Sequence, residues 1–218
     1  MMAQAEIALK DLQAQQEQHG QKISFQEYLK AYNSFEGAHT EWNAGEVDSY
    51  VMTNNLIHQR LLFFLATLVN LFLERNKLGE IVLAGLPMFL GDDKPARQPD
   101  LLIVLNTHRD RIKPTYLDGI ADVVVEIVSP ESDERDHGKK FIEYELAGIP
   151  EYWLIDPIRH EADVYSLAED RHFHRKARSE QGKLVSTVLA GFALDPTILW
   201  MESLPDSDAT TALIAQMG

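Results

Sequence analysis

The sequence contains no cysteine. This absence excludes disulfide bonds, zinc sites built from thiolates and catalytic cysteine nucleophiles. Positive charge is also scarce, because 20 lysine and arginine residues stand against 34 aspartate and glutamate residues, which gives a formal net charge of −14. Such an acidic chain repels polyanions at long range, and this argues against a broad nucleic-acid-binding surface. The charge is compatible with an acidic enzyme that contacts phosphate through a metal ion and a few local cations.

No hydrophobic run is long enough to indicate a membrane span. The most apolar run covers residues 61–73, which is shorter than the roughly 20 residues that a spanning helix needs. Arg60 and Glu74 flank this run. We therefore predict a buried helix here and no membrane partner. The N-terminus shows no basic region followed by an apolar core, so we expect no secretion signal and a cytoplasmic protein.

The chain length of 218 residues and the apolar fraction of 45% allow one domain with elaborations and a substantial core. Residues 1–22 are rich in glutamine and glutamate, and we predict an N-terminal helical extension there. The main domain is expected over residues 23–205 and a C-terminal tail over residues 206–218.

The order of elements within the predicted main domain is that of a sheet with helices. A capping box, Ser24 to Glu27, begins a short helix. A hairpin over residues 40–52 and a long helix over residues 54–77 follow. Apolar strands then alternate with one helix and lead into a β-rich end; the strands are 98–105, 122–128 and 151–156, and the helix is 133–147. This order indicates an α/β or α+β domain with a mixed sheet.

A carboxylate interrupts the most apolar of these strands. Glu126 lies within the run Val123–Val128, which is typical of a strand covered on both faces. A buried carboxylate costs several kcal/mol unless a charge, a metal ion or hydrogen bonds compensate it. Asp100 enters another apolar strand, so the two carboxylates converge if the strands are neighbours. An oxygen-ligand cation such as Mg²⁺ suits a pair of this kind.

A lysine in the following helix would complete a hydrolytic site. Lys139 and Lys140 are both candidates, and Asp136, Lys140 and Tyr144 share one helix face at i, i+4, i+8 spacing. Two acids and a lysine beside a metal ion are suited to phosphodiester hydrolysis. The alternative is a structural salt bridge between Glu126 and Lys140 that has no chemical role.

Three motifs give the chain a resemblance to a known family. They are TEWNAGEV at 40–47, QPDLL at 98–102 and VVVEIVSPESDERDHGKKFIEYELAGIPEYWLIDP at 123–157. The chain resembles the PD-(D/E)xK nuclease superfamily and, more specifically, the Uma-type restriction-endonuclease-like family, over about residues 24–200. The resemblance implies a restriction-endonuclease-like fold, in which helices flank a mixed β-sheet core with an N-terminal hairpin and a C-terminal β-hairpin.

The resemblance also assigns residues to a catalytic site. Asp100 and Glu126 match the metal-binding acids. The strict superfamily motif has lysine two residues after the second acid, where this chain has Val128. In the family resembled here the lysine comes from the following helix, which points to Lys140, with Lys139 as the second choice.

Two further positions match polar positions of the family, namely Glu41 in the first hairpin and His58 at the head of the long helix. Each is either an auxiliary ligand or a structural polar group.

The resulting hypothesis is a metal-dependent nuclease that acts on DNA. Asp100 and Glu126 would hold Mg²⁺, with Mn²⁺ as a substitute, together with a backbone carbonyl for which we take that of Ile127. Lys140 would orient the attacking water or stabilise the transition state. We also expect a homodimer, because the run at 61–73 exceeds the needs of one amphipathic face. The rival hypotheses are a non-catalytic binding or scaffold protein with this fold, and a metal-dependent hydrolase of another phosphoester or a glycosidase.

Overall fold

The computed structural model describes residues 22–32, 39–50, 55–130 and 132–217. The helical extension predicted for residues 1–22 lies outside the described residues, apart from Lys22. The chain divides into two compact units, which are described separately below. The first comprises Met1–Thr53, Leu86–Gln98 and Ile112–Gly119, and the second comprises Asn54–Gly85, Pro99–Arg111 and Ile120–Gly218.

The first unit holds one short helix and small strands. A three-stranded sheet has the order β2-β1-β5, and β4 pairs in parallel with β7. The elements are α2 (Phe25–Tyr32), β1 (His39–Asn43), β2 (Glu46–Tyr50), β4 (Met88–Phe89), β5 (Pro95–Ala96) and β7 (Leu117–Asp118). The predicted capping box is present, since Ser24 Oγ accepts from the Glu27 backbone N–H while the Glu27 carboxylate accepts from the Ser24 N–H. Phe25, Trp42 and Phe89 form the aromatic core of this unit.

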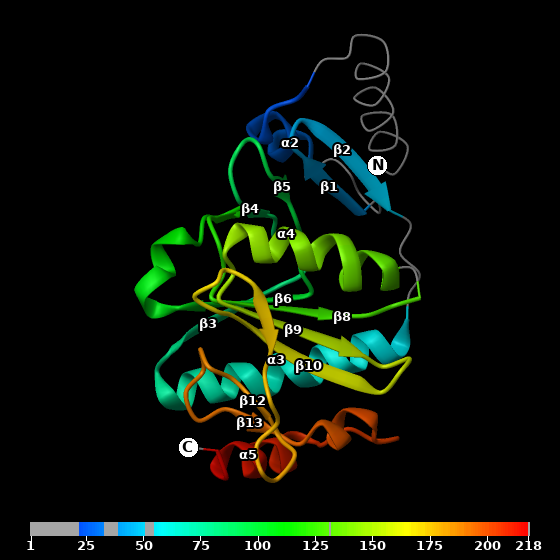
Figure 1. Ribbon diagram of the computed structural model, residues 1–218, viewed down its shortest axis with the longest axis vertical. Coiled ribbons are helices and arrows are strands. Elements are labelled where there is room, and N and C mark those ends of the chain that lie inside the picture. Colours follow the sequence, from blue (N-terminus) through cyan, green and yellow to red (C-terminus); the bar gives the residue numbers. More distant parts are fainter. Residues whose placement is uncertain (1–21, 33–38, 51–54, 131, 218) are drawn as a thin grey trace. The chain divides into compact units, whose positions relative to one another are not determined.

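The second unit contains a six-stranded mixed sheet (Figure 1). Its strand order is β11-β10-β9-β8-β6-β3, and β8 and β9 are parallel while the other neighbours are antiparallel. The strands are β3 (Gly79–Leu83), β6 (Leu101–Leu105), β8 (Val123–Ile127), β9 (Glu151–Asp156), β10 (Glu161–Leu167) and β11 (Phe173–Arg175). The parallel pair requires a crossover connection, and that connection carries the helix α4 (Lys140–Ala147).

Two helices cover opposite faces of this sheet (Figure 1). Alternate residues of the central strands, including Ile103, Val125 and Trp153, pack in one core with the helix α3 (Leu56–Asn76). Their neighbours in sequence face α4, where Tyr144 and Tyr152 have ring centroids 5.4 Å apart. A strand buried on both faces explains the nearly continuous apolar run around Glu126.

The helix α3 corresponds to the long helix expected over residues 54–77. Asn55 caps it by accepting from the Ile57 and His58 backbone N–H groups. With 21 residues, it is long and apolar enough to cross a membrane by length and composition. Most of its apolar run is nevertheless buried against the sheet, with Leu65, Leu68 and Phe72 fully inaccessible. The packing is that of a core helix.

The C-terminal part adds a small hairpin and a helix to the same core. The strands β12 (Leu184–Val185) and β13 (Ala193–Leu194) pair in antiparallel fashion. The second unit also contains the short 3₁₀ helices η1 (Asn106–Arg111) and η3 (Pro196–Trp200) and the α-helix α5 (Ser207–Ala215). The range predicted as a tail, residues 206–218, therefore contains a helix. Ile214 and Met217 are buried in the core with α3, and this burial fixes the segment.

Candidate active site

The two predicted acids lie on neighbouring strands in register. Leu101 of β6 pairs with Val125 of β8, so the antiparallel register continued by one residue sets Asp100 opposite Glu126. Opposed residues of an antiparallel pair point to the same face of the sheet. Asp100 is fixed in place because its Oδ2 accepts the backbone N–H of Ile127 at 2.7 Å. The structure thus brings together the acids that the sequence singled out.

Glu126 is almost completely buried and has two donors on one of its oxygens. The residue is only 2% exposed. Oε1 accepts from Lys140 Nζ at 2.8 Å and from the Tyr144 hydroxyl at 2.7 Å. Burial raises the pKa of Glu126 from its ordinary value of 4.5 to about 8, although the Lys140 ammonium opposes the rise. The nearby Asp136 and Asp100 carboxylates add to the increase in the pKa.

Lys140 lies between two buried carboxylates. Its Nζ is 2.8 Å from Glu126 Oε1 and 3.1 Å from Asp136 Oδ1, and Lys140 itself has 4% exposure. Asp136 is equally buried, and none of the described residues donates a well-aligned hydrogen bond to its Oδ1. The contact between Lys140 and Asp136 is therefore ionic, and one buried oxygen retains capacity for a further cation.

A π-helical turn places these side chains. The turn η2 (Arg135–Lys139) precedes α4, and the Lys140 backbone N–H donates to the carbonyl of Arg135, five residues earlier. The Tyr152 hydroxyl donates to the Asp136 carbonyl at 3.1 Å and anchors the turn to the sheet. The helix expected over residues 133–147 thus consists of this wider turn followed by a regular helix. Wider turns of this type often occur at functional sites.

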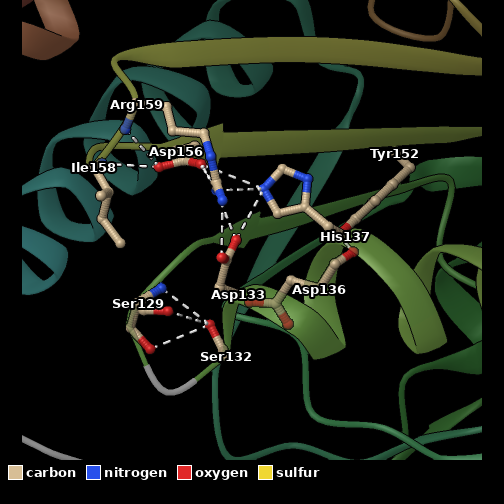
Figure 2. Close-up of polar contacts among 9 residues, drawn as sticks. All are labelled: Ser129, Ser132, Asp133, Asp136, His137, Tyr152, Asp156, Ile158 and Arg159. Carbon is tan, nitrogen blue, oxygen red and sulfur yellow. Dashed lines mark hydrogen bonds and ion pairs between the residues drawn. The ribbon is translucent and has the colours of Figure 1, made fainter.

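A second charged cluster fixes the other side of the turn (Figure 2). Figure 2 shows Asp133, His137, Asp156 and Arg159 pointing toward one another. Arg159 Nη1 is 2.7 Å from Asp133 Oδ1 and 2.6 Å from Asp156 Oδ2, while His137 Nε2 is 3.3 Å from Asp156 Oδ2. The acids and the histidine are close enough together to suit a metal ion, but the Arg159 guanidinium already supplies the cation. We interpret the cluster as an ion-pair network that ties η2 to the end of β9.

His58 also belongs to the candidate site. Its Nε2 lies 3.1 Å from Asp100 Oδ2, on the oxygen that already accepts the Ile127 N–H. Burial alone would lower the pKa of His58, but the hydrogen bond and the charge of Asp100 outweigh it and raise the pKa. The helix α3 therefore contributes a side chain from its first turn to the carboxylate of Asp100.

Glu41 has partners within the first unit. Its Oε2 accepts from Arg97 Nη1 at 2.7 Å, and its Oε1 accepts the Gln98 backbone N–H at 3.3 Å. Arg97 is fully buried, so the pair compensates a guanidinium in the interior of that unit. Of the two alternatives left open by the sequence, this geometry favours the structural polar group for Glu41.

The structure distinguishes the two candidate lysines by burial. Lys140 points into the site, whereas Lys139 is exposed. A step of one residue turns a side chain by about 100° around a helix, which accounts for the difference. The metal-binding role of the Ile127 carbonyl stays a prediction; the backbone N–H of that residue holds Asp100.

Sequence reasoning assigns no role to two residues of the cluster. Asp136 and Tyr144 contact Lys140 and Glu126, respectively. Their spacing around Lys140 is visible in the sequence as one helix face, and this is the signal that could identify them. The decisive information is the partner strand, because only the fold shows that this face meets Glu126.

Comparison with known proteins identifies the family. A family model described as "Putative restriction endonuclease", Uma2, matches residues 25–197. The chain belongs to this family. A crystal structure described as "a putative nuclease belonging to DUF820", from Anabaena variabilis, matches with a TM-score of 0.63 and 18% sequence identity, covering 82% of this chain and 97% of that chain. At this identity the likeness establishes the restriction-endonuclease-like fold. No curated protein matches the chain.

Proposed function

We propose that this member of the Uma2 family is a divalent-metal-dependent nuclease that hydrolyses phosphodiester bonds in DNA. The observation that carries the proposal is the buried cluster on β6, β8 and α4. Asp100 and Glu126 lie on one face of adjacent strands, and Lys140 contacts Glu126 at 2.8 Å. Two acids and a lysine are the groups that metal-assisted phosphodiester hydrolysis needs.

The donor set fits a hard divalent cation. Carboxylate oxygens are the ligands that Mg²⁺ prefers, with Mn²⁺ as a substitute. Asp100 and Glu126 would hold the ion, together with the carbonyl of Ile127, and the buried Oδ1 of Asp136 lies in the same cluster. A bound cation of this kind lowers the pKa of water and neutralises charge on the phosphate.

The protein's own groups orient the acids and supply positive charge. The Ile127 N–H and His58 hold Asp100, so this carboxylate is oriented before any ligand arrives. Lys140 and Tyr144 both donate to Oε1 of Glu126, which leaves Oε2 as the oxygen for a ligand. The Lys140 ammonium then stands beside the place where negative charge develops on the phosphate, and it stabilises that charge.

Two observations favour the non-catalytic alternative. Lys140 already forms ion pairs with Glu126 and Asp136, as a purely structural lysine would. Val128 also stands at the position where the strict superfamily motif has lysine. A scaffold or binding protein with this fold would retain such a cluster for stability alone. Metal binding followed by a substrate panel separates the two functions.

The first test measures metal binding through thermal stability. A ligand that binds only the native state raises the melting temperature. We expect Mg²⁺ and Mn²⁺ to raise it for the wild type, and we expect Asp100→Ala or Glu126→Ala to remove most of that rise. Glu80→Gln is the control, because Glu80 pairs with Arg109 on the surface. An equal metal response in all four proteins would contradict the metal assignment.

The second test measures chemistry with the same proteins. Supercoiled DNA, single-stranded DNA, RNA and a small phosphodiester are incubated with Mg²⁺ or Mn²⁺. Cleavage of DNA that Asp100→Ala abolishes would support the proposal. Metal binding without cleavage of any substrate would favour the scaffold, and cleavage of the small phosphodiester alone would favour another hydrolase.

We also propose that the nuclease acts in the cytoplasm as a homodimer. A two-fold symmetric dimer has two active sites, so each site can act on one strand of a DNA duplex.

A further inference from the structure

A groove of about 810 Å³ lies in the second unit, away from the acidic cluster. One wall is the first half of α3, which contributes Leu56, Arg60 and Phe63. The other wall is the chain that follows η3, which contributes Met201, Glu202 and Leu204. From the first to the last of its lining residues the helical wall extends about 17 Å, at about 1.5 Å per residue.

The rim of this groove is unusually apolar for an exposed surface. Phe63 is 75% exposed, Leu56 is 59% exposed and Met201 is 54% exposed. The opposite side of α3 is already buried against the sheet. A helix that is apolar all round is normally covered all round, and a contiguous exposed apolar patch marks an interaction site.

The same face carries charges of both signs, since Arg60, Glu202 and Asp206 line the groove, and Asp206 caps α5. Arg60 and Glu202 stand on opposite walls, and neither forms an ion pair with any of the described residues. The face also combines a projecting ring, Phe63, with a recess. A two-fold interface brings one patch against itself, so it requires both a projection and a recess, and both a cation and an anion, on one surface.

We propose that this groove is the homodimer interface, with Phe63 of each copy entering the groove of the other and Arg60 of each copy facing Glu202 of the other. The exposed apolar rim supplies the centre of the interface, and the two symmetric ion pairs fix its register. A second copy is favoured over a foreign partner because the charges and the shape of the face complement themselves.

This inference rests on the homodimer in the proposed function and names its surface. It does not depend on cleavage, because assembly is measured without metal or DNA. Failure of the interface would leave the catalytic proposal intact, and failure of cleavage would leave the interface intact.

The test is a charge exchange followed by sedimentation equilibrium at tens of micromolar. The wild type is expected at twice 24.7 kDa. Arg60→Glu alone sets two acids against each other at both contacts, and Glu202→Arg alone sets two cations against each other. Each variant should dimerise at least about tenfold more weakly, since like charges at an interface are strongly unfavourable.

Mixing the two single variants should restore the dimer. In a mixed pair the acid introduced by Arg60→Glu in one copy faces the cation introduced by Glu202→Arg in the other. The second contact of that pair is the native one, because each copy keeps the residue that its partner has lost. Both contacts are again opposite in sign, and for the same reason the double variant Arg60→Glu/Glu202→Arg should dimerise.

Two matched controls separate the interface from a general charge effect. Arg75→Glu makes the charge change of Arg60→Glu at the far end of α3, and Glu180→Arg makes the charge change of Glu202→Arg in the loop between β11 and β12; neither residue lines the groove. Both controls should dimerise like the wild type. Phe63→Ser should dissociate the dimer without any change of charge.

Three results would overturn the inference. The first is a wild type that sediments as a monomer at this concentration. The second is a dimer that none of the groove variants weakens. The third is a mixture of the single variants that stays monomeric. A monomer that floats with phosphatidylcholine–phosphatidylglycerol vesicles would show instead that this face binds a membrane surface.

Discussion

Replacing Lys140 by methionine tests how the buried acids are held. The change keeps an unbranched apolar stem of similar length but removes the ammonium. Glu126 then retains one donor, the Tyr144 hydroxyl, and Asp136 Oδ1 loses its cation at 3.1 Å. Breaking a buried ion pair by removing one partner costs about 3–5 kcal/mol, because a charge is left uncompensated. We expect a loss of unfolding free energy that approaches this size at pH 9, where Glu126 is more fully ionised.

The loss should depend on pH, because Glu126 can take up a proton. Its pKa is already raised to about 8 with Lys140 present, and without the ammonium it rises further. Protonation neutralises the stranded carboxylate, so Lys140→Met should cost less at pH 6 than at pH 9. Urea denaturation at both pH values measures the difference, and Lys139→Met is the exposed control.

Cleavage by the same variant separates structure from chemistry. If Lys140 stabilises the transition state, DNA cleavage should fall by roughly two orders of magnitude or more, measured below the unfolding transition. Unchanged stability at pH 9 would refute the assignment of Lys140 as the partner of Glu126. Full cleavage by a folded Lys140→Met protein would remove this lysine from the mechanism.

Three further predictions concern this cluster and the ion-pair network around Arg159 that supports its π-helical turn. In the metal-free protein the unfolding free energy should fall as the pH rises from about 5 to about 8. The pKa values of Glu126 and His58 are raised, so over this range the folded state holds protons that the unfolded state has lost. Urea titrations measure the slope, and Glu126→Gln should flatten it. Binding of Mg²⁺ should release about one proton per ion at pH 7 and almost none at pH 9, because the Glu126 carboxylate must be ionised to bind the ion. Calorimetry in buffers of different ionisation enthalpy measures the proton release. No proton release at pH 7 would count against Glu126 as a ligand. Arg159→Met should speed hydrogen exchange in η2 and weaken Mg²⁺ binding, whereas Arg159→Lys should restore part of the protection from exchange and part of the Mg²⁺ affinity. Equal exchange rates in the wild type and both variants would show that the network does not hold the turn.

The sequence predicts the acids of the site because a carboxylate in an apolar strand is a strong local signal. Glu126 stands out within its strand without any knowledge of the fold. Asp100 precedes the neighbouring strand, and the resemblance to the family joins the two. The family pattern favours Lys140 over Lys139, and burial in the structure agrees with that preference.

The remaining features depend on contacts between distant parts of the chain. The π-helical turn has no local signature, since it is held by Tyr152 and by the network around Arg159. The partner of Glu41 is Arg97, which lies 56 residues away and cannot be paired with it by spacing. The helix α5 does have a readable signal, because Asp206 caps it by accepting the Ala209 N–H, but its burial depends on α3.

The balance of charge in the cluster explains why a metal ion is the natural completion of this site. Three carboxylates, those of Asp100, Glu126 and Asp136, are served by one buried ammonium, that of Lys140. With His58 neutral, two negative charges are uncompensated in a region of low dielectric constant. Burial is the main cause of the raised pKa of Glu126, and the neighbouring Asp136 and Asp100 carboxylates add to it, because uptake of a proton removes one of the two charges. A divalent cation would remove both, and it would let Glu126 ionise at neutral pH. A purely structural salt bridge between Glu126 and Lys140 would need neither Asp100 nor Asp136 beside it. A structural role for Lys140 therefore does not explain why two further carboxylates lie in the cluster, whereas a divalent metal site does.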